Sequence, residues 1–443
     1  MLEAPRELEN QSRMTHLLAL FRRSSLSACV LAISLLCAFQ PDAHAQQHGQ
    51  RHPLLVGYFS MSSLYTSPPF FVKELADNGS AALLDQINYS AGSVRDGHCS
   101  VGDPLADVLA PYPAQNSVDG TEDDPRFGVH GYFQQLQELK RRYPRLKILI
   151  SLEGRAADFA QDAKPENRAT FVSSCVDVFL RGHLFPGIDA PLLFDGFDID
   201  WESPHLQDAA NFAALLKEFR RQMNALRPGL RLSVAVDQAP GSLPGTDFAA
   251  LAPLVDQFAV MNYDYAGPWS RRTGLIAPLF THTSIVDRSS SIVQSIASYK
   301  AAGVPARKLL MGLPFYGYGW TDVSPTDNGL YQTGRPLHGD HSYNSIRALA
   351  DPPLVFRDHL SQAPWIYDGR NFWTYEDPVS VRYKASYADS QHLGGIMIWD
   401  LSGDTADAEL LHAAHRSLHH PMKAKMFASS VPRAPEPAQQ KGQ

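Results

Sequence analysis

Short apolar runs alternate with helical patterns along most of the chain, and this alternation is the feature that most limits its fold. Repeated strand–helix units imply a parallel sheet, and eight of them imply an α/β fold closed into a TIM (β/α)8 barrel. An open doubly wound sheet is the alternative, but no glycine-rich phosphate-binding fingerprint follows the first strand to support it. The predicted strands are Leu54–Ser60, Leu83–Tyr89, Lys147–Leu152, Leu192–Trp201, Leu230–Val236, Gln257–Tyr263, Lys308–Phe315 and Gly395–Trp399.

Segments with apolar residues at helical spacing lie between these strands. One long stretch, from Phe315 to Val379, breaks the rhythm and is rich in Pro, Gly, Tyr and Trp. Because structureless loops of this length are uncommon in compact domains, we expect a small α+β insertion over residues 319–376, between strands seven and eight. The barrel itself is expected to span residues 52–420. The predicted helices are Tyr132–Tyr143, Phe171–Leu180, Ala209–Leu226, Ile285–Ala301, Val379–Ser390 and Asp407–Leu418.

Residues 1–45 have the features of a signal peptide. Two arginines precede an apolar run, and small residues up to Ala45 offer a cleavage site. The run is too short to span a bilayer, so we expect secretion to the periplasm or the extracellular space without a membrane anchor. Met1 and Met14 are the alternative translation starts. Residues 421–443 are rich in Lys, Pro, Ala and Gln and are predicted to be a disordered tail.

The cysteines divide into two pairs. Cys29 and Cys37 leave with the predicted signal peptide, so Cys99 and Cys175 remain in the mature chain. An even number of cysteines in an oxidising compartment favours one disulfide. Two buried free thiols are the alternative, because the sequence does not tell whether the side chains are close enough to bond.

Charge and aromatic content limit the class of partner. The net charge of −7 lacks the basic character of a nucleic-acid-binding protein. The 22 Phe, 17 Tyr and 6 Trp residues supply the aromatic surface that a neutral sugar polymer requires. We therefore expect a monomer that uses no cofactor and no metal, and that binds neither nucleic acid nor a membrane.

The fourth predicted strand carries a row of acids. Successive side chains of a strand alternate between its faces, so Asp198, Asp200 and Glu202 point to one side and the apolar residues between them to the other. In a barrel the acids would face the interior and the apolar residues would pack on helices. Like charges buried together cannot all ionise, and a solvated strand would leave the apolar set in water. The row therefore indicates a functional site.

This row suits glycoside hydrolysis. Glu202 is nearest the carboxyl-terminal mouth, where barrel active sites form, and its acidic neighbours raise its pKa so that it can act as a general acid. A retaining glycosidase usually places a second carboxylate across the sugar ring, which Asp200 cannot easily reach from the same strand. An N-acetyl sugar brings its own nucleophile, the carbonyl oxygen of its acetamido group. Asp200 would then orient that amide.

The pattern Asp195-x-x-Asp198-x-Asp200-x-Glu202 resembles the signature of glycoside hydrolase family 18, the chitinases and their relatives. Other segments that resemble the family follow on successive strands: Gly57-Tyr58-Phe59, Ile87-Asn88-Tyr89, Met261-Asn262-Tyr263-Asp264, Gly312-Leu313-Pro314-Phe315-Tyr316-Gly317 and Met397-Ile398-Trp399. The resemblance implies a chitinase whose catalytic residues are Glu202, Asp200, Asp198 and Tyr263. It implies contacts to chitin or N-acetylglucosamine oligosaccharides from Tyr58, Met261, Asp264, Met397 and Trp399.

Two positions depart from the family pattern. Glu153, in Ser151-Leu152-Glu153-Gly154, stands where the family usually has glycine, and Ser90-Ala91 replaces a common Ala-Phe step. Both replacements bear on the length of the sugar chain that is bound and on the detailed specificity. Three other functions remain open: an endo-β-N-acetylglucosaminidase acting on glycans or cell-wall fragments, an inactive sugar-binding lectin, and a metal-dependent hydrolase. The lectin is disfavoured because Glu202 is present, and the metal enzyme because His205 is the one histidine near the acids.

Overall fold

The computed structural model describes residues 52–126, 128–202, 204–281 and 291–420, and these residues, His52 apart, fall in one compact unit, Pro53–Gln443. The predicted signal peptide with Ala45, the alternative start at Met14 and the predicted tail lie outside the described residues. None of the helices within the described ranges has the length and apolar character that crossing a membrane requires.

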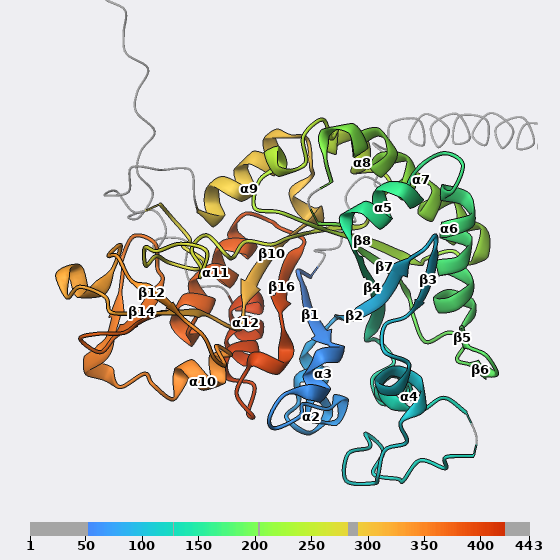
Figure 1. Cartoon of the computed structure of the whole chain (residues 1–443), viewed down its shortest axis with the longest axis horizontal. Helices are drawn as coiled ribbons and strands as arrows, with labels where there is room; N and C mark the ends of the chain where they lie inside the picture. The colour runs from blue at the N-terminus through green and yellow to red at the C-terminus, as the bar shows by residue number, and fades with distance from the viewer. Residues whose placement is uncertain (1–51, 127, 203, 282–290, 421–443) are drawn as a thin grey trace, which may run out of the picture. The chain divides into compact units, whose positions relative to one another are not determined.

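Eight parallel strands close into a barrel, as the sequence predicts (Figure 1). Their order is β1-β16-β10-β9-β8-β7-β4-β2, and β1 also pairs with β2, which closes the sheet. Leu54 stands opposite Gly395 and Val56 opposite Gln86 at this closure. The barrel strands are β1 (Leu54–Ser60), β2 (Gln86–Arg95), β4 (Lys147–Gly154), β7 (Gly196–Asp200), β8 (Arg231–Val236), β9 (Gln257–Val260), β10 (Leu309–Pro314) and β16 (Gly395–Trp399).

Helices follow most of the strands and pack on the outside of the barrel (Figure 1). Local signals set their ends: the Asp377 carboxylate accepts hydrogen bonds from the backbone N–H groups of Val379 and Ser380, and Pro378 occupies the first helical position of α11. The helices are α2 (Val72–Asp77), α3 (Ser80–Leu83), α4 (Gly131–Arg142), α5 (Ala156–Asp162), α6 (Arg168–Cys175), α7 (Ala209–Leu226), α8 (Phe248–Leu251), α9 (Ile292–Ala301), α10 (Tyr343–Arg347), α11 (Pro378–Ser390) and α12 (Glu409–His419).

The two faces of β7 are used as the alternation predicts. Phe197 points outward and meets Phe219 of α7, with ring centroids 5.2 Å apart. Trp201 stacks on Phe159 of α5 at 5.5 Å, so the apolar set is shielded by helices. The strand begins at Gly196, which has φ of +153° and where a Cβ atom would lie 1.8 Å from the carbonyl oxygen of Arg231. Glycine is therefore required for β7 to approach β8.

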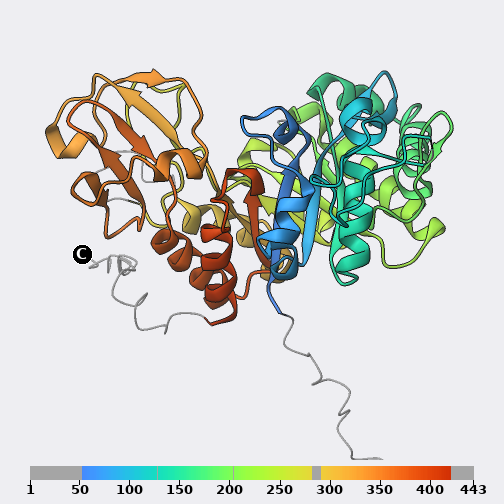
Figure 2. The same cartoon turned by 90° about the horizontal axis from the view of Figure 1, so that it is seen from below.

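An antiparallel sheet of five strands lies between β10 and β16 in the sequence, which gives the predicted α+β insertion in the barrel (Figure 2). Its strand order is β12-β11-β15-β14-β13, and a small core that includes Trp320, Trp365 and Phe372 stabilises it. The helix α10 also lies in this segment. The strands are β11 (Tyr318–Thr321), β12 (Arg335–Leu337), β13 (Val355–Arg357), β14 (Pro364–Tyr367) and β15 (Phe372–Thr374).

A disulfide links a hairpin to a helix at the edge of the barrel. The end of β2 pairs with the short antiparallel strand β3 (His98–Val101), and Cys99 of β3 is bonded to Cys175 at the end of α6. The bond closes a separation of 76 residues. A second hairpin, β5 (His183–Phe185) with β6 (Ile188–Asp189), precedes β7.

Several predicted boundaries are wrong. Leu83 belongs to α3, and β2 instead runs to Arg95, because pairing with β4 and β3 sustains a strand through small and polar residues that hydrophobicity does not mark. Leu192 lies outside β7: it is 63% exposed and its φ is +66°. The strand β9 ends at Val260, and the residues that follow it form the site. The helix predicted from Ile285 is described from Ile292, and its first residues lie in the undescribed gap.

Candidate active site

The predicted site residues come together at the carboxyl ends of the barrel strands. Asp198 and Asp200 lie on β7, and Glu202 follows that strand by two residues. Tyr58 lies on β1 and Trp399 is the last residue of β16. This end of a TIM barrel positions active sites, because the loops there vary over a rigid core. Three further predicted residues follow β9: Met261, Tyr263 and Asp264.

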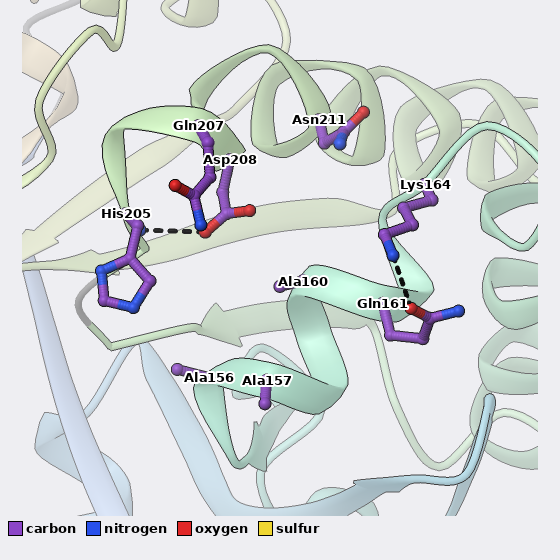
Figure 3. Close-up of a pocket in the computed structure, with 9 residues that line it drawn as sticks. All are labelled: Ala156, Ala157, Ala160, Gln161, Lys164, His205, Gln207, Asp208 and Asn211. Atoms are coloured by element: carbon purple, nitrogen blue, oxygen red, sulfur yellow. Dashed lines mark hydrogen bonds between the residues drawn. The ribbon is translucent and has the colours of Figure 1, made fainter.

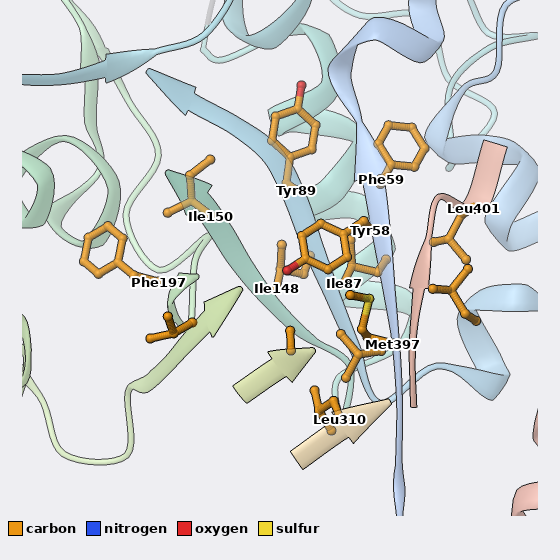
Figure 4. Packing of buried hydrophobic residues seen from close by; sticks show 14 of the residues in the cluster. Tyr58, Phe59, Ile87, Tyr89, Ile148, Ile150, Phe197, Leu310, Met397 and Leu401 are labelled. Atoms are coloured by element: carbon orange, nitrogen blue, oxygen red, sulfur yellow. The ribbon is translucent and has the colours of Figure 1, made fainter. Parts of the chain in front are cut away.

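Asp198 is the innermost acid of the row and is closed to solvent. Its Oδ2 accepts hydrogen bonds from the Tyr58 hydroxyl at 2.6 Å and from the Ser151 hydroxyl at 3.0 Å. Tyr58 extends from β1 toward the other strands of the barrel (Figure 4). Burial raises the pKa of Asp198, whereas the donated hydrogen bonds lower it. Two neutral donors thus fix this carboxyl group in place.

Asp200 is 8% exposed, and its Oδ1 is buried with no hydrogen-bond partner among the described residues. Burial raises the pKa of Asp200 well above its ordinary value, and the charges of Asp198, Glu153 and Glu202 raise it further. Such surroundings favour a protonated carboxyl group or one that shares a proton with a neighbour. Buried polar atoms without partners are uncommon in proteins, and this oxygen lies among the other acids of the row.

Glu202 is the exposed member of the row. Partial removal from water raises the pKa of its carboxyl group, and the negative charges of Asp237 and Asp264 add to the effect. The neighbouring Asp200 repels the same charge, since the negative charge of Glu202 is among those that raise the pKa of Asp200. Asp237 and Asp264 come from the ends of two other strands, β8 and β9. A carboxylic acid with a raised pKa that is open to solvent can donate a proton to a bound molecule.

Tyr263 and Asp264 lie beside Asp200 and Glu202 and form one side of the site, which is called the wall below. Tyr263 is buried at 6% exposure, and the charges of Asp200, Asp264 and Glu202 act on its hydroxyl. Asp264 adopts a left-handed backbone conformation, with φ of +61°, and its Oδ1 accepts a 2.6 Å hydrogen bond from the Tyr316 hydroxyl. A Cβ atom at Gly312 would lie 2.4 Å from the carbonyl oxygen of Val260 and 3.0 Å from the Tyr263 ring. Glycine at 312 therefore makes room for this wall.

Trp399 lies against Tyr58, with ring centroids 5.2 Å apart and the planes tilted by 53°. Its side chain is half-buried, so part of the ring faces the mouth. Met261 is also half-buried. Met397 is 1% exposed and belongs to the barrel core (Figure 4), so it presents no surface to a ligand in this structure. A substrate contact from Met397 stays a prediction.

A family model for glycosyl hydrolases family 18 matches residues 54–404. The chain belongs to this family. Chitinase C of Streptomyces lividans is 31% identical over 369 residues, covering 80% of this chain and 58% of the relative. Chitinase 63 of Streptomyces plicatus is 31% identical over 378 residues, covering 82% and 60%. The chain thus spans about three fifths of the length of these curated relatives.

Solved structures of family 18 share the fold. The catalytic domain of a psychrophilic chitinase B from Arthrobacter TAD20 matches with a TM-score of 0.77 and 29% identity, covering 84% of this chain and 96% of that one. A family 18 N-acetylglucosaminidase from Paenibacillus barengoltzii matches with a TM-score of 0.65 and 27% identity, covering 83% and 100%.

Sequence reasoning missed three aromatic residues and one acid at this family 18 site. Asp237 directly follows β8, so the rule that found Glu202, an acid just past a strand end, could have found it as well. The aromatic residues continue the wall outward from Tyr263. The ring of Tyr263 contacts Tyr316, which contacts Tyr318, which contacts the 64% exposed Trp269, at centroid distances of 6.0, 5.6 and 5.6 Å.

A cavity of about 440 Å³ lies between α5 and the segment that leads from Glu202 into α7 (Figure 3). His205 lines it, and the His205 backbone N–H donates to Asp208 at 3.0 Å. None of the acids of the row lines this cavity.

Within the described ranges, no group of three or more His, Cys, Asp or Glu side chains is placed to hold a metal ion. His205, the histidine considered as a metal ligand, follows Glu202 by three residues and lines the cavity described above.

Proposed function

We propose that this chain is a secreted chitinase that hydrolyses the β-1,4 linkages between N-acetylglucosamine units. One observation carries the proposal: β7 and the residues just after it bear three acids in a row, two of them buried and the outermost, Glu202, open at the mouth of a family 18 barrel. Curated relatives and structural neighbours named as chitinases support the substrate class. The predicted signal peptide, together with the Cys99–Cys175 disulfide, supports export to an oxidising compartment.

Glu202 is the general acid in this proposal. Its raised pKa increases the fraction of the carboxyl group that is protonated, and the protonated form gives its proton to the glycosidic oxygen as the bond from C1 to that oxygen breaks. The resulting carboxylate then takes a proton from the water that completes hydrolysis. One residue thus serves as acid in the first step and as base in the second.

The nucleophile is the acetamido carbonyl oxygen of the sugar itself. Asp200 ends β7 and Glu202 follows it by two residues, so we expect both carboxyl groups on one side of the sugar ring, with Asp200 unable to attack C1 as a protein nucleophile. Attack by the acetamido oxygen forms a cyclic oxazolinium ion, and Asp200 stabilises the positive charge that develops on the amide nitrogen. Water opens this ion from the other face. Two inversions at C1 leave a product of β configuration.

The remaining residues hold the sugar in place. The Tyr263 hydroxyl and the Asp264 carboxylate stand beside Asp200 and Glu202, where they would bind the acetamido group. Trp399 offers a ring face beneath the sugar at the point of cleavage. Asp198 keeps the inner end of the row fixed through Tyr58 and Ser151.

A second candidate is an endo-β-N-acetylglucosaminidase that uses the same chemistry on another glycan. The structural likeness to an N-acetylglucosaminidase whose whole chain aligns supports keeping this candidate. Incubation of the purified mature chain with colloidal chitin, soluble chitin oligosaccharides and a high-mannose glycopeptide separates the two. We expect short N-acetylglucosamine oligomers from the first two substrates and no release of glycan from the third. Glycan release without chitin hydrolysis would contradict the chitinase proposal.

A further inference from the structure

The two positions at which this chain departs from the family pattern touch each other. The Ser90 hydroxyl on β2 donates a hydrogen bond to Oε1 of Glu153 on β4. Ser90 stands opposite Ser151 in the pairing of these strands, and the register then shifts between Ser90 and Gly92. Such a shift re-aims the side chains beside it. The two replacements therefore form one unit, a carboxyl group and the hydroxyl that holds it.

The register between β4 and β7 brings this unit beside the acids. Ser151 stands opposite Asp198 and Glu153 stands opposite Asp200. Residues two apart on a strand share a face, and the 3.0 Å hydrogen bond from Ser151 to Asp198 marks that face as the barrel interior. Glu153 thus occupies the next level toward the mouth, next to the carboxyl group of Asp200. The family's usual glycine would place no charge there.

We propose that Glu153, held by Ser90, is a positioning residue that controls the protonation of Asp200 and thereby sets the acid side of the enzyme's pH range. This inference rests on the proposed function. A carboxylate beside Asp200 opposes ionisation of Asp200, so the ionised form appears at higher pH than it would without Glu153. The charge of Glu153 is among those that raise the pKa of Asp200, in agreement with the register.

Several other titratable groups lie near Asp200 and also influence its protonation or that of its neighbours. Asp198 lies on β7, Glu202 just beyond it, Asp237 after β8, and Tyr263 and Asp264 after β9. Tyr58 enters from β1. All of them stay in place in variants that alter Glu153 or Ser90 alone, so a change in pH dependence reports on the pair.

Ser90 tunes the charge of Glu153. Burial raises the pKa of Glu153, and the hydrogen bond from Ser90 lowers it. Loss of the hydroxyl therefore favours the neutral form of Glu153 and weakens its effect on Asp200. Ser90→Ala should act in the same direction as Glu153→Gln, but less strongly.

The test is the pH dependence of kcat/KM on a soluble chitin oligosaccharide. We expect Glu153→Gln to move the acid limb to lower pH by about one unit, as removal of one neighbouring charge would. Ser90→Ala should give a smaller shift of the same sign, and the double variant should shift no further than Glu153→Gln. Glu153→Asp keeps the charge and should stay near the wild-type limb. Glu122→Gln, which removes an exposed carboxylate that is not part of the site, is the matched control and should give no shift.

A second readout does not depend on turnover: the carboxyl 13C NMR titration of Asp200 should move in step with the acid limb. Identical acid limbs and identical titrations in wild type and Glu153→Gln would overturn the proposal. If Glu153→Gln does not fold, Ser90→Ala decides between the same two outcomes. Failure of the proposed function looks different, since the wild-type chain would then hydrolyse no N-acetylglucosamine oligomer at any pH while the titration still reports on Glu153.

Discussion

The two ends of the barrel differ in how their buried polar groups are hydrogen-bonded. At the amino end, Gln86 and Gln257 exchange hydrogen bonds of 3.0 and 3.1 Å, and Arg231 donates to Gln86 at 3.1 Å. At the carboxyl end, Asp198 and Asp200 each keep one buried oxygen without a partner among the described residues. The first arrangement pairs neutral amides with each other and with Arg231, whereas the second buries acids beside one another.

The hydrogen-bonded groups at the amino end stabilise the barrel, whereas the acids at the carboxyl end are proposed to perform the chemistry. An unpaired buried polar group costs about 1–3 kcal/mol of folding free energy, so selection for stability alone would remove it. The acids persist at the mouth because burial and mutual repulsion raise their pKa values, which proton transfer requires. Variants at the two ends should therefore affect different measurements.

The largest effect is expected at the mouth. Glu202→Gln keeps the shape of the side chain and removes the proton it donates, so kcat should fall by about a hundredfold to ten-thousandfold. Its thermal stability at neutral pH should be equal to or higher than that of the wild type. The native site raises the pKa of Glu202, so ionisation at neutral pH destabilises the folded state, and a neutral amide avoids this penalty. Turnover near the wild-type rate would contradict the assignment of Glu202.

The opposite result is expected at the amino end. Gln257→Leu leaves the buried amide of Gln86 with one partner fewer and should lower the free energy of unfolding by about 1–3 kcal/mol. Its kcat should stay within about twofold of the wild type, because no group at the mouth changes. Urea unfolding and steady-state kinetics on the same preparation check both parts. A large loss of kcat with unchanged stability would contradict the claim that the amino end serves stability and the carboxyl end serves catalysis.

The smallest effect is expected for the aromatic floor. Trp399→Ala removes a half-buried ring that contacts Tyr58, and about tenfold of kcat/KM should be lost with the stacking surface. The thermal midpoint should change little, since the ring is only partly buried at the edge of the core. Loss of stability with retained activity would identify Trp399 as a packing residue.

Much of this contrast could be predicted from the sequence. The period-two pattern on β7 placed Asp198 and Asp200 inside the barrel and Phe197 outside, because side-chain alternation is a property of the strand alone. The eight repeated units likewise predicted a closed barrel. Both inferences depend on local geometry that one segment sets for itself.

Features that depend on neighbouring strands could not be predicted in this way. The strand β2 continues to Arg95 because β4 pairs with it as far as Val94 and β3 pairs with it from Gly92, and the hydrophobicity of its own residues does not indicate this. The charges that raise the pKa of Glu202 come from Asp237 and Asp264, whose proximity is set by strand order. The contact between Ser90 and Glu153 follows from the β2–β4 register, which spacing along the chain does not reveal.

The central claim is that the acetamido group of the sugar, and not a protein carboxylate, attacks the anomeric carbon. Digestion of partly deacetylated chitosan, with sequencing of the new reducing ends, tests it most directly. Each cut must then follow an N-acetylated sugar, so we predict N-acetylglucosamine at every new reducing end, whatever the degree of acetylation. Glucosamine at the new reducing ends, in proportion to its share of the polymer, would contradict the account and require a nucleophile supplied by the protein or by water.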